Sequence, residues 1–208
     1  MTELTLYGES SWVSPWVFHV LVALEELGRP YRLELLPLPI PAALAKNLAT
    51  KAVLPTVPCL VHGELWLTES SAITEYLAEV FPGSRLLPPE PMPRARARQV
   101  MSWLRTSLHA LRDERPTTSV FHRPVRTPLS DQARAHAAEL VRVAERLLPS
   151  GAAHLFGGWS IADADLGLAL MRLIANEDPV PARLTDYALG QWSRASVRKY
   201  LSYVPTNR

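Results

Sequence analysis

Short alternating runs of apolar and polar residues, separated by a stretch with helical spacing, begin the chain. Residues 4–7 alternate and end at Gly8, which is typical of a short strand. Over residues 14–27 apolar side chains recur every three or four positions, and Gly28 is a natural helix end. An extended run follows at residues 31–36. This order predicts a parallel βαβ unit, in which the loop after the first strand lies at the ligand-binding carboxyl edge of the sheet.

The pattern then predicts two more strands, at residues 58–62 and 65–67, and a helix over residues 70–80. A cluster of four prolines follows, and proline interrupts both helices and strand ladders. We therefore predict a linker over residues 84–93, which contains Pro88, Pro89, Pro91 and Pro93.

Beyond the prolines the spacing is helical throughout. Ser160 and Asp163 have the spacing of a capping box at the start of an almost wholly apolar helix. The sequence therefore predicts an α/β domain over residues 1–83 and an all-helical domain over residues 94–208. The helices expected in the second domain cover residues 94–112, 131–148 and 163–175, with a loop over 116–130.

Composition and charge exclude several classes of function. The 208 residues carry a formal net charge of +2, so no strong field favours nucleic acid or an anionic membrane. The single cysteine, Cys59, excludes an internal disulfide, and the six histidines are too dispersed for a local zinc motif. With no apparent signal peptide or membrane-spanning stretch, we expect a cytosolic protein without a bound metal.

Ser14 stands at the expected start of the first helix, where backbone amides are unpaired and the helix carries partial positive charge. Thiol oxidoreductases have C-x-x-C in this turn, whereas this chain has S-P-W-V and cannot exchange a disulfide there. A serine hydroxyl can donate to the sulfur of a bound thiol and favour its ionised form. Two alternatives remain: Ser14 is only a helix cap, or the neighbouring Ser10 or Ser11 contacts the thiol.

Two further pairs are candidates for holding a peptide-like thiol. Val57 and Pro58 begin a strand, and a cis bond between them would turn the backbone of Val57 toward a ligand. Glu69 and Ser70 stand at a helix start, where a carboxylate suits an ammonium group and amides suit a carboxylate. Both residues of the second pair would also serve as capping residues. Two other polar groups are expected to be structural, with His19 packed in the first helix and Cys59 buried and inert.

These motifs together resemble the glutathione transferase family over the whole chain, through S-P-W-V, V-P, E-S-S-A-I-T-E-Y-L and S-I-A-D-A-D. The chain is most similar to serine-type bacterial members, as R-A-R-A-R-Q, F-G-G-W-S-I-A-D and Q-W-S-R-A-S-V indicate. The resemblance implies a thioredoxin-like N-terminal domain, an all-α C-terminal domain, glutathione as co-substrate and a homodimer.

The resemblance also implies a role for each motif. Ser14 would hydrogen-bond the glutathione sulfur, the backbone of Val57 would pair with the cysteinyl unit, and Pro58 would be cis. Glu69 and Ser70 would hold the γ-glutamyl end. Many relatives have a basic or amide side chain just before V-P, but this chain has Thr56 there, which leaves the glycyl carboxylate to Lys51 or another donor.

The second substrate is expected to be a small apolar electrophile, such as an aromatic halide, an unsaturated carbonyl compound or an organic peroxide. Trp12, Trp16 and Trp103 either wall an apolar cleft for it or pack in the core. The principal hypothesis is a glutathione transferase, with peroxide reduction as a variant of the same chemistry. The alternatives are a glutathione-dependent cis–trans isomerase and a non-catalytic binding module of the same fold.

Overall fold

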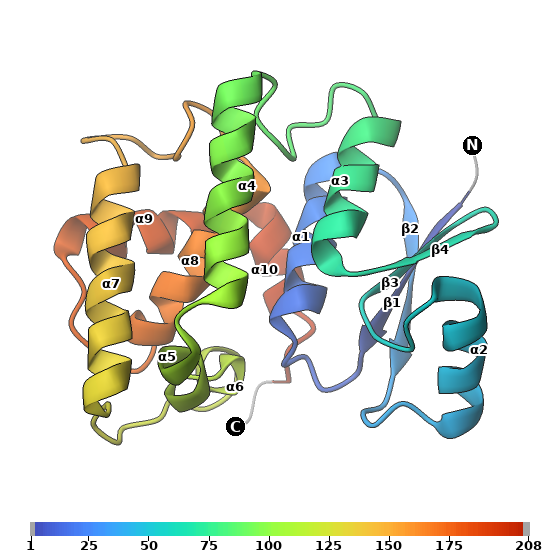
Figure 1. Cartoon of the computed structure of the whole chain (residues 1–208), viewed down its shortest axis with the longest axis horizontal. Helices are drawn as coiled ribbons and strands as arrows, with labels where there is room; N and C mark the ends of the chain where they lie inside the picture. Colours follow the sequence, from blue (N-terminus) through green and yellow to red (C-terminus); the bar gives the residue numbers. More distant parts are fainter. Residues whose placement is uncertain (1–2, 206–208) are drawn as a thin grey trace. The chain divides into compact units, whose positions relative to one another are not determined.

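The computed structural model describes residues 3–205 (Figure 1). The chain forms two compact units that divide between Leu86 and Leu87. The first has the element order βαβαββα of a thioredoxin-like domain, and the second is helical, so the predicted fold class is confirmed. The elements of the first unit are β1 (Leu4–Glu9), α1 (Pro15–Leu27), β2 (Tyr31–Leu36), α2 (Ala42–Ala52), β3 (Cys59–His62), β4 (Leu65–Thr68) and α3 (Ser70–Val80).

The first unit is built on a four-stranded sheet with the order β2-β1-β3-β4. β1 pairs with β2 in parallel, as the predicted βαβ unit requires, and β3 runs antiparallel to both β1 and β4. The register sets Tyr7 opposite Cys59, and Cys59 opposite Thr68. The chain that leaves β1, the chain that enters β3 and the chain that leaves β4 therefore reach the same edge of the sheet.

Helices α1 and α3 contact each other (Figure 1). α1 also packs closely on β1, because a Cβ added at Gly8 would lie 3.0 Å from Cγ1 of Val17. A buried polar chain links the two helices: Nε2 of His19 lies 2.8 Å from Oγ1 of Thr74, which in turn donates to the carbonyl oxygen of Ser70 at 3.0 Å. His19 is fully buried, in agreement with the structural role expected of it.

Helix α2 was not predicted from the sequence. Only Leu48 and Ala52 of this helix are buried and Leu44 packs partly buried beside them, so the apolar face is narrow and gives a weak helical signal. They pack with Leu36 and Cys59, and the stacked rings of Tyr7 and Trp66 border this cluster with a centroid distance of 5.5 Å.

The second unit is arranged around α8, a helix that is buried on almost every side. Its capping box forms as predicted, with the Asp163 carboxylate accepting from the Ser160 amide at 2.9 Å. No helix among the described residues is long and apolar enough to cross a bilayer. The elements are α4 (Pro91–Thr106), α5 (His109–Glu114), α6 (Thr117–Phe121), α7 (Asp131–Leu147), α8 (Ile161–Ile174), α9 (Ala182–Trp192) and α10 (Ala195–Leu201).

The single helix predicted over residues 94–112 is wrong. The first helix, α4, begins at Pro91, because first-turn amides have no intrahelical acceptor and proline is tolerated there. It ends at Thr106, where Leu108 takes a left-handed backbone with φ of 60° and a second helix, α5, starts. The predicted loop over 116–130 also contains the short α6, which is too brief to show a period.

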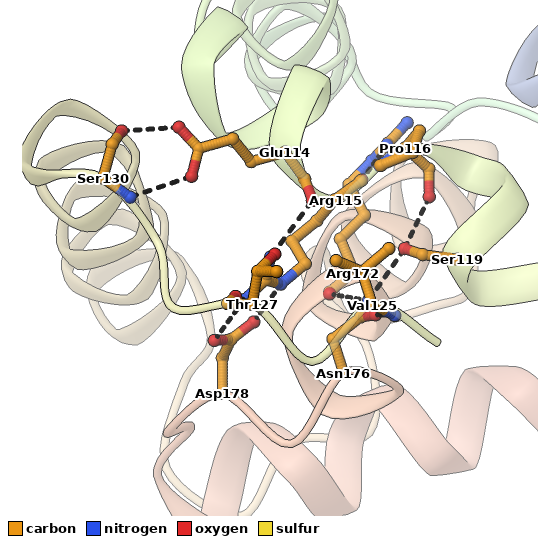
Figure 2. Close-up of polar contacts among 10 residues, drawn as sticks. All are labelled: Glu114, Arg115, Pro116, Ser119, Val125, Thr127, Ser130, Arg172, Asn176 and Asp178. Atoms are coloured by element: carbon orange, nitrogen blue, oxygen red, sulfur yellow. Dashed lines mark hydrogen bonds and ion pairs between the residues drawn. The ribbon is translucent and has the colours of Figure 1, made fainter. Parts of the chain in front are cut away.

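A buried ion pair fixes the segment after α5 to the segment that follows α8 (Figure 2). The Arg115 side chain is 2% exposed, and its Nε and Nη2 donate to the two carboxylate oxygens of Asp178 at 2.6 and 3.0 Å. Nη2 also donates to the carbonyl oxygen of Thr127 at 2.8 Å. This planar, two-bond geometry is the strongest arrangement that an arginine and a carboxylate can form.

Two neighbours of this pair extend the network (Figure 2). Arg172 donates to the carbonyl oxygen of Arg115 at 2.6 Å, and burial lowers the pKa of Arg172 to about 10. Asn176 donates to the hydroxyl of Ser119 at 2.8 Å and accepts from the amide of Val125. The non-helical chain beyond α6 is thus held by side chains of α8 and the residues that follow it.

Replacing Asp178 with alanine should lower the free energy of unfolding by about 3 kcal/mol, because it leaves the buried Arg115 guanidinium without its counter-ion. Chemical denaturation measures this loss. Arg126→Ala is the control, since it breaks an ion pair with Glu177 whose side chains are 53% and 74% exposed, and it should cost less than about 1 kcal/mol. Equal losses of unfolding free energy in the two variants would contradict a special stabilising role for the pair of Arg115 and Asp178.

Candidate functional site

The edge of the sheet where β1 ends gathers the candidate residues of the first unit. Glu9 ends β1, Val57 and Pro58 lead into β3, and Glu69 follows β4. The pairing of Tyr7 with Cys59, and of Cys59 with Thr68, places these three segments side by side. Ser14 joins them at the start of α1, five residues after β1 ends.

Ser14 is the N-cap of α1. Its backbone is extended, and its Oγ accepts from the amides of Trp16 and Val17, each at 3.2 Å. A serine oxygen has two lone pairs and one proton, so these two bonds use its acceptor capacity and leave the proton. No described residue accepts a hydrogen bond from the Ser14 hydroxyl. Capping and donation to a ligand are therefore compatible, although the sequence presented them as alternatives.

The start of α1 suits an anion. Its first turn contains no acidic residue, and the partial positive charge of the helix lies at this end. Of the three serines proposed as partners of a thiol, only Ser14 stands at the helix start, while Ser10 and Ser11 lie in the exposed part of the preceding loop.

Glu9 is a member of this site that the sequence reading missed. Its side chain is fully buried, and Oε1 accepts from the amides of Val13 and Ser14 at 2.7 and 2.9 Å. The available signal was a charged residue at the end of an otherwise uncharged strand. It was overlooked because an acid next to a turn is usually solvated.

The Val57–Pro58 peptide bond is cis, as the resemblance implied. Pro58 is buried and Val57 is partly exposed at the sheet edge. A second cis bond, Leu38–Pro39, was not foreseen.

Glu69 and Ser70 begin α3. Glu69 makes no side-chain capping bond, so its exposed carboxylate remains available, and Ser70 is buried. The backbone of Glu69 has φ of 68°, a left-handed conformation that costs a residue with a side chain roughly 1–3 kcal/mol. Sequence could not reveal this strain, which favours a functional reason for the residue.

Lys51 lies in the last turn of α2, with its Nζ 4.6 Å from the centre of the Trp66 ring. This cation–π contact holds an exposed ammonium near the cluster that includes Val57. No group of three acidic, histidine or cysteine side chains among the described residues is placed to hold a metal ion.

The three tryptophans proposed for the second substrate belong to different units. Trp12 is only 4% exposed, with φ of 54°, and Trp16 is partly exposed in the first turn of α1. Trp103 lies on α4 and donates to Glu139 of α7 at 3.2 Å. It also lines a surface groove of about 490 Å³ with residues that include Arg96, Val143 and Leu147.

Two family models match the chain, a glutathione S-transferase N-terminal domain over residues 13–80 and a glutathione S-transferase C-terminal domain over residues 91–205. The chain belongs to the glutathione S-transferase family. The thioredoxin-like and helical units are the two domains of that family's fold.

Individual glutathione transferases are also similar to this chain in sequence or in fold. A glutathione transferase homologue from Burkholderia GL BGR1, crystallised with bound glutathione, is 30% identical, with 97% of each chain covered and a TM-score of 0.77. The Omega 1C enzyme of Trametes versicolor, at 22% identity, a TM-score of 0.72 and coverage of 98% of this chain and 94% of its own, shares the fold. Glutathione S-transferase U1 of Arabidopsis thaliana is 38% identical over 89 residues, which span 42% of this chain and 38% of that protein.

Cys59, the single cysteine of the chain, is shielded from solvent. Cys59 is fully buried between β1 and β4 in the sheet and beneath α2, and burial raises its pKa to about 11. Near neutral pH the side chain is therefore a neutral thiol, which is a poor nucleophile.

We expect the native protein to leave Cys59 unmodified by a thiol reagent at neutral pH, and the unfolded protein to react at one site. Because the folded pKa lies above the unfolded value of about 8.5, stability should fall as pH rises from about 8.5 to 11. Cys59→Ala should lessen that fall, as denaturation midpoints at pH 7 and pH 10 would show. Rapid modification of the native protein would contradict the buried, neutral thiol.

Proposed function

We propose that this chain is a serine-type bacterial glutathione transferase, in which Ser14 activates the glutathione thiol for attack on a small apolar electrophile. The observation that carries the proposal is the hydroxyl of Ser14, whose oxygen is fixed by two amides while its proton remains available at the positive end of α1. Membership of the family and the glutathione bound to the Burkholderia homologue give independent support.

The energetic demand on Ser14 is modest. A free thiol with a pKa of about 8.5 is only a few per cent ionised near neutrality. Lowering that pKa by about 2 units makes the thiolate the main species, and corresponds to about 2.7 kcal/mol. One charge-assisted hydrogen bond and the partial charge of the helix start together have this magnitude.

The rest of the first unit would hold the peptide. The backbone of Val57, at the cis bond before β3, would pair with the cysteinyl unit of glutathione. Glu69 would bind the γ-glutamyl ammonium, and the amides and hydroxyl at Ser70 would bind its carboxylate. Lys51 is the proposed partner of the glycyl carboxylate.

In the proposed reaction the thiol proton leaves for solvent and the thiolate forms a carbon–sulfur bond with the electrophile. A halide leaves in a displacement, or the carbanion of an addition is protonated. Trp16, partly exposed in the same turn as Ser14, offers an apolar contact beside the sulfur. With an organic peroxide, the glutathione thiolate would attack a peroxide oxygen, which releases an alcohol and leaves glutathione sulfenic acid. A second glutathione would then condense with the sulfenic acid to give glutathione disulfide and water.

Replacing Ser14 with alanine should return the pKa of the bound glutathione thiol to near its solution value. It should also lower kcat/KM for conjugation by 10-fold or more, because each loss of about 1.4 kcal/mol in transition-state stabilisation slows the reaction tenfold. Ultraviolet thiolate absorbance of the complex, followed over pH, measures the first effect. The lost cap should also reduce stability by about 1 kcal/mol.

Ser130→Ala controls for that lost cap. Ser130 is the N-cap of α7, where its Oγ accepts from the amide of Ala133 at 3.2 Å and donates to the Glu114 carboxylate. This variant should lose at least as much stability and still ionise glutathione normally. If the wild-type protein binds glutathione without ionising its thiol, the proposed function is contradicted.

Replacing Glu69 with glutamine should weaken glutathione binding about tenfold, because a neutral amide attracts an ammonium less than a carboxylate does. The pKa of the bound thiol should stay unchanged, since Ser14 sets it. Titration calorimetry gives the affinity, and Glu79→Gln, at an exposed site in the last turn of the same helix, should bind as wild type. An unchanged affinity in Glu69→Gln would remove Glu69 from the site.

A further inference from the structure

Glu9 presents an unusual combination of burial and charge. Its side chain has no exposed surface, and Oε1 accepts from the Val13 and Ser14 amides at 2.7 and 2.9 Å. The other oxygen, Oε2, is buried and has no hydrogen-bond partner among the described residues. No basic side chain of the described chain lies within ion-pair distance of it. A buried carboxylate without a cation is costly, so its retention at this position needs a reason.

One reason is the loop that carries Ser14. The loop is tied at its start by the Ser10 amide, which donates to the carbonyl oxygen of Leu36 at 2.9 Å, and at its end by the Glu9 carboxylate. Between these ties Trp12 has the left-handed φ of 54°, which persists only where the surroundings enforce it. Without Glu9, the amides of Val13 and Ser14 lose their acceptor, and the position of Ser14 is no longer fixed.

The second reason is electrostatic. Oε1 touches the amide of the residue whose hydroxyl caps the helix, so the carboxylate lies beside the place where a sulfur bound to Ser14 must sit. A negative charge there opposes ionisation of that sulfur, whereas the helix start and the Ser14 proton favour it. This balance has a chemical use, because a thiolate becomes less nucleophilic as the pKa of its thiol falls, and the best attacking thiol has a pKa near the ambient pH.

We propose that Glu9 is a positioning residue of the sulfur site: its carboxylate fixes the turn that presents Ser14, and its charge limits the ionisation of the thiol bound there. The inference rests on the proposed function, because it presupposes a thiol at Ser14.

The other titratable groups on the elements that pack around Glu9 are engaged elsewhere. On α1, His19 bonds to Thr74, and on β2, Glu34 pairs with Arg32. On the sheet, Tyr7 stacks on Trp66, and Cys59 of β3 is a buried neutral thiol. None of these side chains bonds to Glu9, whose contacts are the two amides. Glu69, at the same edge of the sheet, is exposed and screened by solvent, whereas Glu9 is buried and bonded to the Ser14 amide. The carboxylate of Glu9 is therefore the charge that should act most strongly at the start of α1.

The test compares Glu9→Gln with Glu9→Ala. Glutamine keeps the carbonyl oxygen that the two amides need and removes the charge, whereas alanine removes both. Glu64→Gln is the matched control, because it makes the same change at an exposed turn between β3 and β4, at the opposite end of the sheet. For each protein we would measure the dissociation constant for glutathione and titrate the bound thiol by its ultraviolet absorbance.

Glu9→Gln should bind glutathione within about threefold of wild type, while the pKa of the bound thiol falls by about one unit, the order of magnitude expected for removing one nearby charge in a partly buried site. Glu9→Ala should bind at least tenfold more weakly, so that the glutamine variant rescues it. Glu64→Gln should match wild type in both measurements. A purely structural role would weaken binding in Glu9→Ala without moving the thiol pKa in Glu9→Gln.

A bound-thiol pKa in Glu9→Gln equal to or above that of wild type would overturn the electrostatic part. Wild-type affinity in Glu9→Ala would overturn the positioning part, and if that variant does not fold, the titration of Glu9→Gln alone decides. Failure of the proposed function is visible separately, because the wild-type protein itself would then bind glutathione without ionising it, and this inference would fall with it. If the wild-type protein ionises the thiol and Glu9→Gln leaves its pKa unchanged, the proposed function stands and only the electrostatic part of the inference fails.

Discussion

The candidate site depends on one constraint: the amides at the start of α1 have no acceptor within the helix and need one elsewhere. Because Pro15 has no backbone N–H, the donors that need an acceptor here are the amides of Ser14, Trp16 and Val17. The Ser14 hydroxyl accepts from Trp16 and Val17, and the Glu9 carboxylate accepts from Ser14 and from Val13 just before it. The same bonds that begin the helix therefore hold the Ser14 hydroxyl oxygen that we propose as the partner of the thiol. Structure and chemistry coincide in this turn, so a change to either acceptor affects both stability and the proposed activation.

Much of the fold could be predicted from the sequence, because its central elements have strong local patterns. The βαβ unit, α3 and α7 have clear periodicity, and α1, α7 and α8 begin at the capping residues Ser14, Ser130 and Ser160. The failures fall where the local signal is weak. Helix α2 buries two side chains, and the break between α4 and α5 depends on the left-handed backbone of Leu108. A leucine gives no warning of that conformation, which tertiary packing imposes.

The site was predicted less completely than the fold. The helix start at Ser14, the cis bond before Pro58 and the uncapped Glu69 form as expected, whereas the strained backbone of Glu69 was not foreseen, and the binding roles of these residues stay predictions. Glu9 was missed because its contacts form only when the loop folds back on the strand and brings two amides to one buried oxygen. Motif reading identifies residues that would touch a ligand, but it does not identify the residues that hold them in place.

The most direct test is a crystal structure of the protein with glutathione. The account predicts the sulfur within hydrogen-bond distance of the Ser14 hydroxyl oxygen, with the bonds from Trp16 and Val17 to that oxygen retained. A glutathione whose sulfur lies against Ser10 or Ser11 instead, or a Ser14 hydroxyl turned away from the sulfur, would contradict the central claim.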